Sequence, residues 1–534
     1  MMKRVNVRLG AAIIATASLT VSNQAIAATP GIIYMESKNS AVTLTPFLTA
    51  GDKVGSYVVP GIPDGLGALP AGEGKLKLLT NHEWSATNAV AAGRTTAAGA
   101  ASGSFISEST YNLKTGEVEK MRDFISDVIW YDYSTGEFGS KPVAPAGALA
   151  KDAYGTENHS RLINRFCSAT LAPAGLFYDK ASGLGYQGAV FLTGEEGGDE
   201  SRAFAVNMDG EMVQMPRFGL SAWENLKPAQ TKGKSTVVLG MEDGSAVDSQ
   251  LWLYQGTKTK KGQWFEKAGL NNGKLYVLSA GTSIANDNAF RTTYGKNFPV
   301  EVTFEKVDWN TNGVEQNNQA RTAGMELARV EDGHFDPNKP NDFYFVTTES
   351  NKDPKATAPN PETPSVSRDG GALWRLRFVD VNTPSKGATL ELLLDGSEQP
   401  YLSKPDNIAV DAVGNVLIQE DPGNNALVAR IVAYNIKSKK VSVMAQFKSE
   451  YFAAGGTSFI TQDEESSGII DVTDLLKTGA KDKARYYMYV AQIHSPTAKA
   501  RPDLDPTSSW LASAVEGGQW YVMKVQEWNL VYNS

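Results

Sequence analysis

Six apolar runs of strand length recur along the chain, and each run ends in polar or acidic residues. Runs of this kind are typical of mostly buried strands. Because they recur at uneven spacing with loops of variable size between them, we predict an all-β fold, organised as a six-bladed β-propeller in a single domain with loop insertions. The six runs are residues 76–83, 189–196, 236–243, 343–349, 415–421 and 486–494.

Two of the repeated units match in greater detail. Glu331 lies five residues before Asp336, and Asp406 lies five residues before Asp411. Residues rich in turn formers follow Asp336 and Asp411 and lead into the next apolar run. The repeated unit is therefore acid, strand, turn, strand, acid, and the hairpins of a propeller blade require such a unit.

Acidic side chains at the strand ends predict a metal site. The innermost strands of a propeller line a central channel, so acids at their ends converge, and cations must compensate the crowded charge. Oxygen ligands in this number suit Ca²⁺. The alternative is that these acids are solvated strand ends that pair with nearby Lys and Arg side chains. The argument depends most on three acidic doublets, Glu195-Glu196, Glu242-Asp243 and Glu420-Asp421.

Cys167 is the only cysteine of the chain, so it cannot form an internal disulfide. A free exposed thiol would be open to oxidation outside the cytoplasm, and we therefore expect Cys167 to be either buried or bound to a metal. A thiolate suits a softer transition metal such as iron. The alternative is a buried side chain that only contributes to apolar packing.

Arg329 is a candidate for binding substrate. It lies two residues before Glu331, and on a strand this spacing places both side chains on one face. An arginine beside metal-bound carboxylates can hold a phosphate or carboxylate group in two hydrogen bonds. The alternative is a structural salt bridge from Arg329 to Glu331 or Asp332.

The chain has four histidines, and their positions show no zinc-binding spacing. Two of them, His82 and His494, follow apolar runs at the proposed rim of the channel, where they could contact substrate. Packing or surface roles remain the alternative for both.

The first 27 residues have the pattern of a secretory signal peptide. Basic residues precede an apolar run over residues 9–21, and Ala25 and Ala27 offer a cleavage site of small residues. We therefore expect a periplasmic or extracellular protein whose propeller domain comprises residues 28–534. The apolar run has 13 residues, whereas a membrane-spanning helix needs about 20, so we expect no membrane span.

Charge and proline content complete the outline of the chain. Without the three cations of the signal segment, the formal net charge changes from −8 to −11, which argues against nucleic acid as a partner. Residues 352–364 contain four prolines and few apolar residues. This segment is predicted to be an exposed insertion within one blade.

The order of the short motifs resembles that of the PhoX-type alkaline phosphatases, over roughly residues 70–500. The motifs that carry the resemblance are Asn81-His82-Glu83, Asn164-Arg165-Phe166-Cys167, Gly194-Glu195-Glu196, Arg329-Val330-Glu331, Pro405-Asp406-Asn407 and Gln492-Ile493-His494.

The resemblance implies a six-bladed propeller that holds calcium ions and ferric iron and hydrolyses phosphomonoesters, with diesters second, outside the cytoplasm. Cys167 would be the iron-bound thiolate, Glu331 an iron ligand at the catalytic centre, Arg329 the phosphate clamp and Asp406 a further metal ligand. Glu195 and Glu196 would belong to the calcium side. Small phosphorylated molecules would be the partners of a monomeric enzyme.

The remaining candidate residues complete the predicted site. Glu242 or Asp243 would replace a family ligand whose place is taken here by residues 249–252, Glu420 is a further metal candidate, and His82 and His494 are candidates for substrate binding. Two other functions stay open. One is a calcium-binding propeller that serves as a scaffold without catalysis, and the other is a calcium-dependent lactonase or phytase-like hydrolase.

Overall fold

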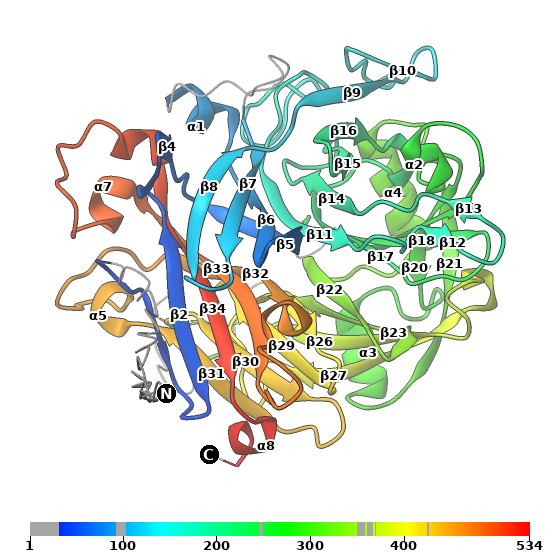
Figure 1. Ribbon diagram of the computed structural model, residues 1–534. Helices are drawn as coiled ribbons and strands as arrows, with labels where there is room; N and C mark the ends of the chain where they lie inside the picture. Colours follow the sequence, from blue (N-terminus) through cyan, green and yellow to red (C-terminus); the bar gives the residue numbers. More distant parts are fainter. Residues whose placement is uncertain are drawn as a thin grey trace, which may run out of the picture.

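The computed structural model describes residues 31–91, 103–244, 249–349, 358–359, 367–368, 370–423 and 427–533. The predicted signal peptide, residues 1–27, lies outside the described residues, as does most of the predicted insertion at residues 352–364. Strands dominate the part of the chain that is described (Figure 1), and the all-β prediction is confirmed. Among the described residues, no helix combines the length and apolar character that crossing a membrane requires.

The first half of the chain forms two antiparallel-rich sheets. A four-stranded sheet has the order β5-β6-β7-β8, with β5 (Pro63–Gly72), β6 (Lys75–His82), β7 (Phe105–Asn112) and β8 (Glu117–Asp123). A six-stranded sheet has the order β10-β9-β16-β15-β14-β11, with β9 (Asp127–Asp132), β10 (Glu137–Gly139), β11 (Phe166–Ala172), β14 (Val190–Glu195), β15 (Ala203–Asn207) and β16 (Glu211–Gln214).

The middle of the chain forms one nine-stranded sheet with the order β17-β18-β19-β20-β21-β27-β26-β23-β22. Its strands are β17 (Trp223–Pro228), β18 (Ser235–Glu242), β19 (Leu251–Thr257), β20 (Lys274–Ser279), β21 (Val300–Val307), β22 (Val330–Asp336), β23 (Lys339–Thr347), β26 (Ala372–Phe378) and β27 (Ala388–Asp395). The strand β21 joins two runs of four strands, so that β17 and β22 lie at opposite edges of this sheet.

The last part of the chain forms two sheets that also take in the first strands. A five-stranded sheet has the order β1-β31-β30-β29-β28, with β1 (Met35–Ser37), β28 (Pro405–Val410), β29 (Asn415–Glu420), β30 (Arg430–Asn435) and β31 (Val441–Phe447). A four-stranded sheet has the order β2-β34-β33-β32, with β2 (Val42–Thr49), β32 (Glu464–Asp471), β33 (Arg485–Pro496) and β34 (Glu516–Val525).

Short elements connect these sheets. The two-stranded ribbons are β3 (Lys53–Val54) with β4 (Tyr57–Val58), β12 (Tyr178–Asp179) with β13 (Leu184–Gly185), and β24 (Ala358–Pro359) with β25 (Ser367–Arg368). The described helices are α1 (Ala86–Ala91), α2 (Trp264–Lys267), α3 (Asp287–Tyr294), α4 (Gly313–Ala323), α5 (Ser449–Phe452), α6 (Thr473–Leu476), α7 (Thr497–Ala500) and α8 (Trp528–Val531), with 3-10 turns at Pro216–Phe218, Pro384–Lys386 and Leu511–Ala514.

Six sheet-edge strands meet around one centre. The strands β5, β11, β17, β22, β28 and β32 each lie at an edge of a sheet, and each contacts the next in this order. The strand β32 also contacts β5, so the contacts close a ring, and the labelled members lie toward the middle of the view in Figure 1. We call these six the ring strands. The predicted count of six blades stays a prediction.

The two predicted turns are present. Asp336 ends β22, and its Oδ1 accepts hydrogen bonds from the backbone N–H groups of Asn338 at 2.8 Å and Lys339 at 3.2 Å. Asp411 follows β28, and its Oδ1 accepts from Val413 at 2.9 Å and from Asn415 at 2.8 Å. Each aspartate thus fixes the hairpin that returns the chain toward the centre.

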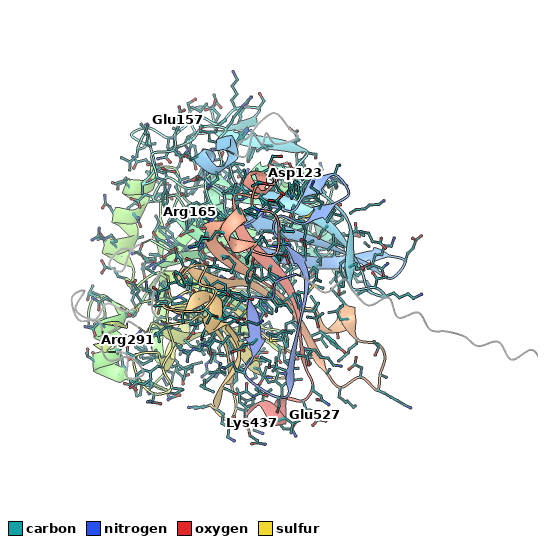
Figure 2. The ribbon with its side chains drawn as sticks, turned by 90° about the vertical axis from the view of Figure 1, so that its left-hand side faces the viewer. Asp123, Glu157, Arg165, Arg291, Lys437 and Glu527 are labelled. Atoms are coloured by element: carbon teal, nitrogen blue, oxygen red, sulfur yellow. The ribbon has the colours of Figure 1, made fainter. Side chains whose placement is uncertain are left out.

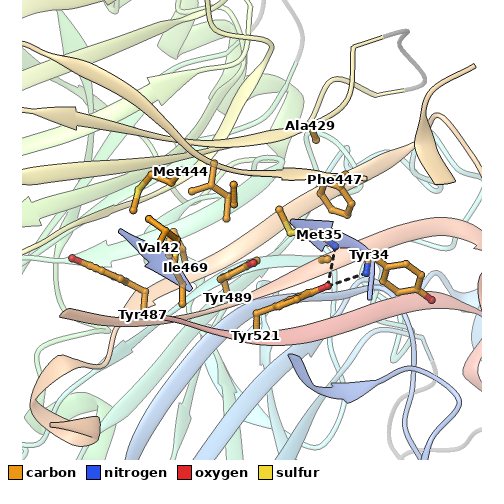
Figure 3. Packing of buried hydrophobic residues seen from close by; sticks show 14 of the residues in the cluster. Tyr34, Met35, Val42, Ala429, Met444, Phe447, Ile469, Tyr487, Tyr489 and Tyr521 are labelled. Carbon is orange, nitrogen blue, oxygen red and sulfur yellow. Dashed lines mark hydrogen bonds between the residues drawn. The ribbon is translucent and has the colours of Figure 1, made fainter. Parts of the chain in front are cut away.

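The N-terminal strands are completed by residues from the other end of the chain. The Tyr521 hydroxyl accepts hydrogen bonds from the backbone N–H groups of Tyr34 and Met35, both at 3.1 Å, as Figure 3 shows. The Tyr521 ring stacks on Tyr489 with 5.1 Å between ring centroids. This buried apolar cluster, together with the β2–β34 pairing, joins the first and last strands.

Candidate metal centre

The second residue of every ring strand carries a metal-binding type of side chain. Because side chains alternate along a strand, the same position on six strands around one centre points the same way. All six side chains are buried. They are Asp64 on β5, Cys167 on β11, Glu224 on β17, Glu331 on β22, Asp406 on β28 and Glu465 on β32.

A second set of polar residues comes from the partner strands. The first residue of each ring strand pairs across the ladder with one residue of the neighbouring strand, and the residue after that one belongs to this second set. The six residues are Glu83, Glu196, Asp243, Thr348, Asp421 and His494. The two sets therefore repeat with the sheets. Seven of the twelve residues are sequence-predicted candidates or members of the acidic doublets, namely Cys167, Glu196, Asp243, Glu331, Asp406, Asp421 and His494.

Four groups of three side chains could each hold a metal ion, because their ligand atoms all lie within 4.8 Å of one another. Each group shares a residue with another, so the groups form one continuous chain of donors around the ring. They are Asp64, Glu83 and Cys167; Cys167, Glu196 and Glu224; Glu224, Glu331 and Asp406; and Asp406, Asp421 and Glu465. We call them the four donor groups.

The donor groups contain more buried carboxyls than the neighbouring cations Arg165, Arg329 and His494 can compensate. Burial, and then the neighbouring acids, raise the pKa values of Asp64, Glu224 and Asp406 well above their usual range. Burial raises the pKa of Glu196 to about 8 and that of Asp421 to about 7. Cations placed among these carboxyls would remove the cost of the buried charge.

Cys167 lies inside this chain of donors. Its Sγ donates a hydrogen bond to Asp64 Oδ2 at 3.2 Å, and burial followed by the charges of Asp64 and Glu224 raises the pKa of the thiol well above its usual range. Asp64 Oδ1 is buried without a hydrogen-bond partner among the described residues. A soft thiol, a buried carboxylate with a spare oxygen and an all-oxygen remainder fit the iron and calcium ions that the sequence predicts.

Hydrogen bonds between ring strands support the donors. The third residues of the ring strands bond to each other. Asn225 Nδ2 on β17 donates to the two neighbouring strands, to Asp332 Oδ1 at 2.8 Å and to Ser168 Oγ at 3.2 Å. Ser168 Oγ on β11 donates to Asn407 Oδ1 on β28, across the ring, at 2.9 Å. Because these side chains are buried and paired, they hold the strand spacing on which the donor groups depend.

Two arginines face the donor groups. Arg329 and Arg165 both line a cavity of about 400 Å³, together with Glu196, Asp243 and Tyr154. Asp243 accepts hydrogen bonds from Arg329 Nε at 2.6 Å and Nη2 at 2.8 Å. We call this space the arginine cavity.

The second arginine is held by acids of the donor groups. Arg165 Nη2 pairs with Glu83 and with Glu196, the latter at 3.2 Å, and Arg165 Nε has no hydrogen-bond partner among the described residues. The guanidinium lies 5.0 Å from the ring centroid of Tyr154. Figure 2 labels Arg165 among the side chains of the upper half of the molecule.

The sequence predicted that Arg329 and Glu331 share a face because they are two residues apart on one strand, but Arg329 lies outside the strand. It precedes β22 with φ of 58°, in the left-handed region, and so does not share the extended geometry of the strand. Its Nη2 still lies 3.4 Å from Glu331 Oε1. Arg165 before β11, with φ of 52°, and Lys404 before β28, with φ of 49°, occupy equivalent positions.

The structure brings together Cys167, Glu196, Glu331 and Asp406 in the donor groups, and it places Asp243 and Arg329 beside them. His494 is also close, with Nε2 3.7 Å from Glu465 Oε2 and Nδ1 3.0 Å from Glu516 Oε2.

Four of the sequence-predicted site residues lie apart from the donor groups. Glu195 pairs with Arg202 at 2.7 Å, and Glu420 pairs with Arg430 at 2.7 Å. Glu242 accepts hydrogen bonds from the Trp252 indole at 2.8 Å and from the Gln250 backbone at 2.9 Å. The fourth, His82, contacts the Gly61 carbonyl at 3.0 Å and Ser107 Oγ at 2.8 Å.

The reason is the same for all four. Each is the last residue of its strand's ladder, and the next residue points to the opposite face. The second member of each doublet therefore faces the centre, and the first is held by partners within its own sheet.

Sequence reasoning missed Asp64, Glu83 and Glu224 as candidate ligands and Arg165 as a second cation, and within the doublet Glu420-Asp421 it chose Glu420. A repeated triplet of cation, apolar residue and donor could have found part of this set. It occurs as Arg165-Phe166-Cys167, Arg329-Val330-Glu331 and Lys404-Pro405-Asp406.

A family model described as alkaline phosphatase PhoX matches residues 207–469, a range that contains β17, β22 and β28 and most of β32. Among solved structures, PhoX from Pseudomonas fluorescens, in complex with the transition-state analogue vanadate, is 11% identical, and the alignment covers 94% of this chain and 97% of that chain with a TM-score of 0.58. This likeness concerns the fold.

A luciferin-regenerating enzyme is also 11% identical, with 87% of this chain and 91% of that chain covered, and its TM-score is 0.28. Comparison with curated proteins finds no significant match.

Proposed function

Because the chain belongs to the PhoX family of alkaline phosphatases, which are phosphoric ester hydrolases, we propose that the donor groups hold calcium and iron ions and that the protein hydrolyses phosphomonoesters outside the cytoplasm. The observation that carries this proposal is the continuous chain of four donor groups beside a cavity lined by two arginines. Acids that were only solvated strand ends would not be buried and would not share ligand distances.

The chemistry of the donors assigns the ions to different places. The two donor groups that contain Cys167 would hold iron, since they offer a thiol with carboxylates. The two all-carboxylate groups, which share Asp406, would hold calcium. This proposal moves Glu196 to the iron side and Glu331 to the calcium side, the reverse of what the family resemblance implies. Glu195, Glu242, Glu420 and His82 are left out of this ligand set because other partners hold them. When bound, such ions act as Lewis acids that neutralise the phosphoryl oxygens.

The chain's own residues would bind and orient the phosphoryl group. Asp243 occupies Nε and Nη2 of Arg329, which fixes the guanidinium and leaves Nη1 with a 3.6 Å contact to Glu349. Arg165 brings a second guanidinium to the same cavity. Two fixed cations of this geometry suit the oxygens of a phosphomonoester dianion and balance the charge that shifts during transfer.

The closed ring of contacts supports six blades, one behind each ring strand, with the nine-stranded sheet counted as two. The pattern of residues 1–27 supports export, and fractionation of cells that express the chain with and without this segment tests it. We further propose a monomer, because the donor groups are complete within one chain.

Metal analysis of the purified protein combined with hydrolysis of p-nitrophenyl phosphate tests the proposal. We expect calcium and iron to copurify, chelation to abolish hydrolysis, and added ions to restore it. Calcium without iron and no turnover would instead support the calcium-binding scaffold. The proximity of a thiol and two arginines to one cavity favours the enzyme, since a scaffold needs neither.

A further inference from the structure

A second cavity adjoins the arginine cavity. It has a volume of about 570 Å³, within the size range of small-molecule sites, and it is lined by the loop residues 148–151 and 154–158, by the start of α1 and by Ala144 and Leu162. Tyr154 lines both cavities, so one side chain forms the boundary between them. Figure 2 labels Glu157, which lines the second cavity, at the top of the view with Arg165 below it.

Most of the residues that line the second cavity are apolar, and two of their side chains are strongly exposed. The exposed fraction is 51% for Leu149 and 58% for Tyr154. Alanines 86, 144, 148 and 150 also line it, and its polar lining residues are Thr87, Lys151, Thr156, Glu157 and Asn158. Exposed apolar side chains that gather beside a cavity are typical of a ligand-binding surface. Apolar residues that are scattered singly over a surface are ordinary and indicate no binding site.

The loop that carries these residues is held firmly. Asp152 Oδ1 accepts hydrogen bonds from the Tyr154 and Thr156 backbone at 2.9 and 2.7 Å, and its Oδ2 accepts from Asn164 Nδ2 at 2.6 Å. The Leu149 N–H donates to buried Glu200 at 3.2 Å. The cavity wall is therefore tied to the strands that carry Cys167 and Glu196.

We propose that the second cavity receives the alcohol portion of the ester, so that the enzyme prefers phosphomonoesters of bulky aromatic or apolar alcohols. The inference rests on the proposed function. With the phosphoryl group between Arg165 and Arg329, the ester oxygen and its alcohol substituent would point toward the Tyr154 ring and into the second cavity. Water forms the new bond to phosphorus, the ester P–O bond breaks, and the leaving oxygen takes a proton to give the alcohol and phosphate.

Comparison of 1-naphthyl phosphate with glycerol 1-phosphate tests the inference on the full, metal-loaded protein. We expect the wild-type protein to have the higher kcat/KM for 1-naphthyl phosphate. Leu149→Asp should lower kcat/KM for this ester by about tenfold, because it places a charge beside the apolar side chains of the subsite. The same variant should change kcat/KM for glycerol 1-phosphate by less than about twofold. Inhibition by inorganic phosphate, which has no alcohol portion, should be unchanged.

Two further variants separate the subsite from general effects. Ala148→Trp fills the cavity, and it should lower kcat/KM for 1-naphthyl phosphate without lowering kcat/KM for glycerol 1-phosphate. Phe298→Asp is the matched control, since Phe298 is likewise 51% exposed but lines neither cavity. Two results would overturn the inference but not the proposed function. One is an active wild-type protein with equal kcat/KM for the two esters, and the other is a Leu149→Asp variant whose kcat/KM falls equally for both. A wild-type protein inactive toward both esters would overturn the proposed function and the inference with it.

Discussion

At the scale of single residues, the site depends on side chains that interrupt the repeat. Five of the six second positions on the ring strands are carboxylates, and the sixth is Cys167. Arg165 and Arg329 occupy equivalent places before their strands, where the other sheets have different residues. Under the proposed function, the repeated carboxyls would bind cations, and Cys167, Arg165 and Arg329 would set the identity of the metal and bind the phosphoryl group.

Cys167→Ser should remove iron and leave calcium. A hydroxyl fills almost the same volume but is a poor ligand for a soft metal, and the calcium groups do not contain Cys167. We expect loss of iron by elemental analysis, loss of p-nitrophenyl phosphate hydrolysis, and an unchanged far-UV circular dichroism spectrum. Full activity of this variant would mean that the thiol only packs.

Arg165→Gln should weaken phosphate binding. It removes one of the two cations of the arginine cavity, and a charge-assisted hydrogen bond contributes about 1.5–3 kcal/mol, so we expect KM and the inhibition constant for inorganic phosphate to rise about tenfold or more. Arg165→Lys retains the charge and should recover part of this loss. Arg329→Gln should have at least as large an effect. Unchanged inhibition by phosphate in Arg165→Gln would restrict Arg165 to a structural ion pair.

At the scale of elements, strand alternation decides which member of each acidic doublet faces the centre. Glu195 and Glu196 are neighbours in sequence, yet one pairs with Arg202 and the other belongs to a donor group. Sequence could identify the doublet and the end of the strand. It could not choose between the two, because a shift of one residue in register exchanges the two faces of a strand.

Glu196→Gln and Glu195→Gln form a matched pair for this alternation. Glu196→Gln should lower metal content and activity with little loss of stability in the metal-free state. Glu195→Gln should leave the metal content unchanged but destabilise the fold by about 3–5 kcal/mol, because it breaks a buried ion pair with Arg202. Metal analysis and urea unfolding of both variants check these expectations. Loss of metal in Glu195→Gln with unchanged metal content in Glu196→Gln would mean that Glu195 is the ligand.

At the scale of the whole molecule, the donor groups bring together segments from both ends of the chain. Asp64 and Glu465 contact the same Gln492 side chain, at 3.2 and 3.1 Å. Strands β1 and β2 complete sheets whose other strands come from the C-terminal part. Ions bound at the centre should therefore stabilise the entire ring, and not only one sheet.

The metal-free protein should lose stability as the pH rises. Burial raises the folded-state pKa of Glu196 from 4.5 to about 8 and that of Asp421 from 3.8 to about 7. Between these values the folded protein binds more protons than the unfolded chain, so the free energy of unfolding falls as pH increases through this window. We expect a lower Tm at pH 8 than at pH 5.

Calcium should suppress that pH dependence, because a bound ion takes the place of the protons that relieve repulsion between the carboxyls. Thermal unfolding followed by circular dichroism, with and without calcium, checks both expectations. A metal-free Tm that rises from pH 5 to pH 8 would contradict the compensation argument.

Local sequence patterns were enough to predict the all-β class, the hairpin turns after Asp336 and Asp411, and Cys167, Arg329, Glu331 and Asp406 as candidates beside acidic strand ends. Those features depend on local patterns of apolar, acidic and turn-forming residues. The three-dimensional fold was needed to show which acid of each doublet faces the centre, which distant segments share a donor group, and that Tyr154 lines two cavities. Strand register and the packing of sheets far apart in sequence set these relations, and no local pattern encodes them.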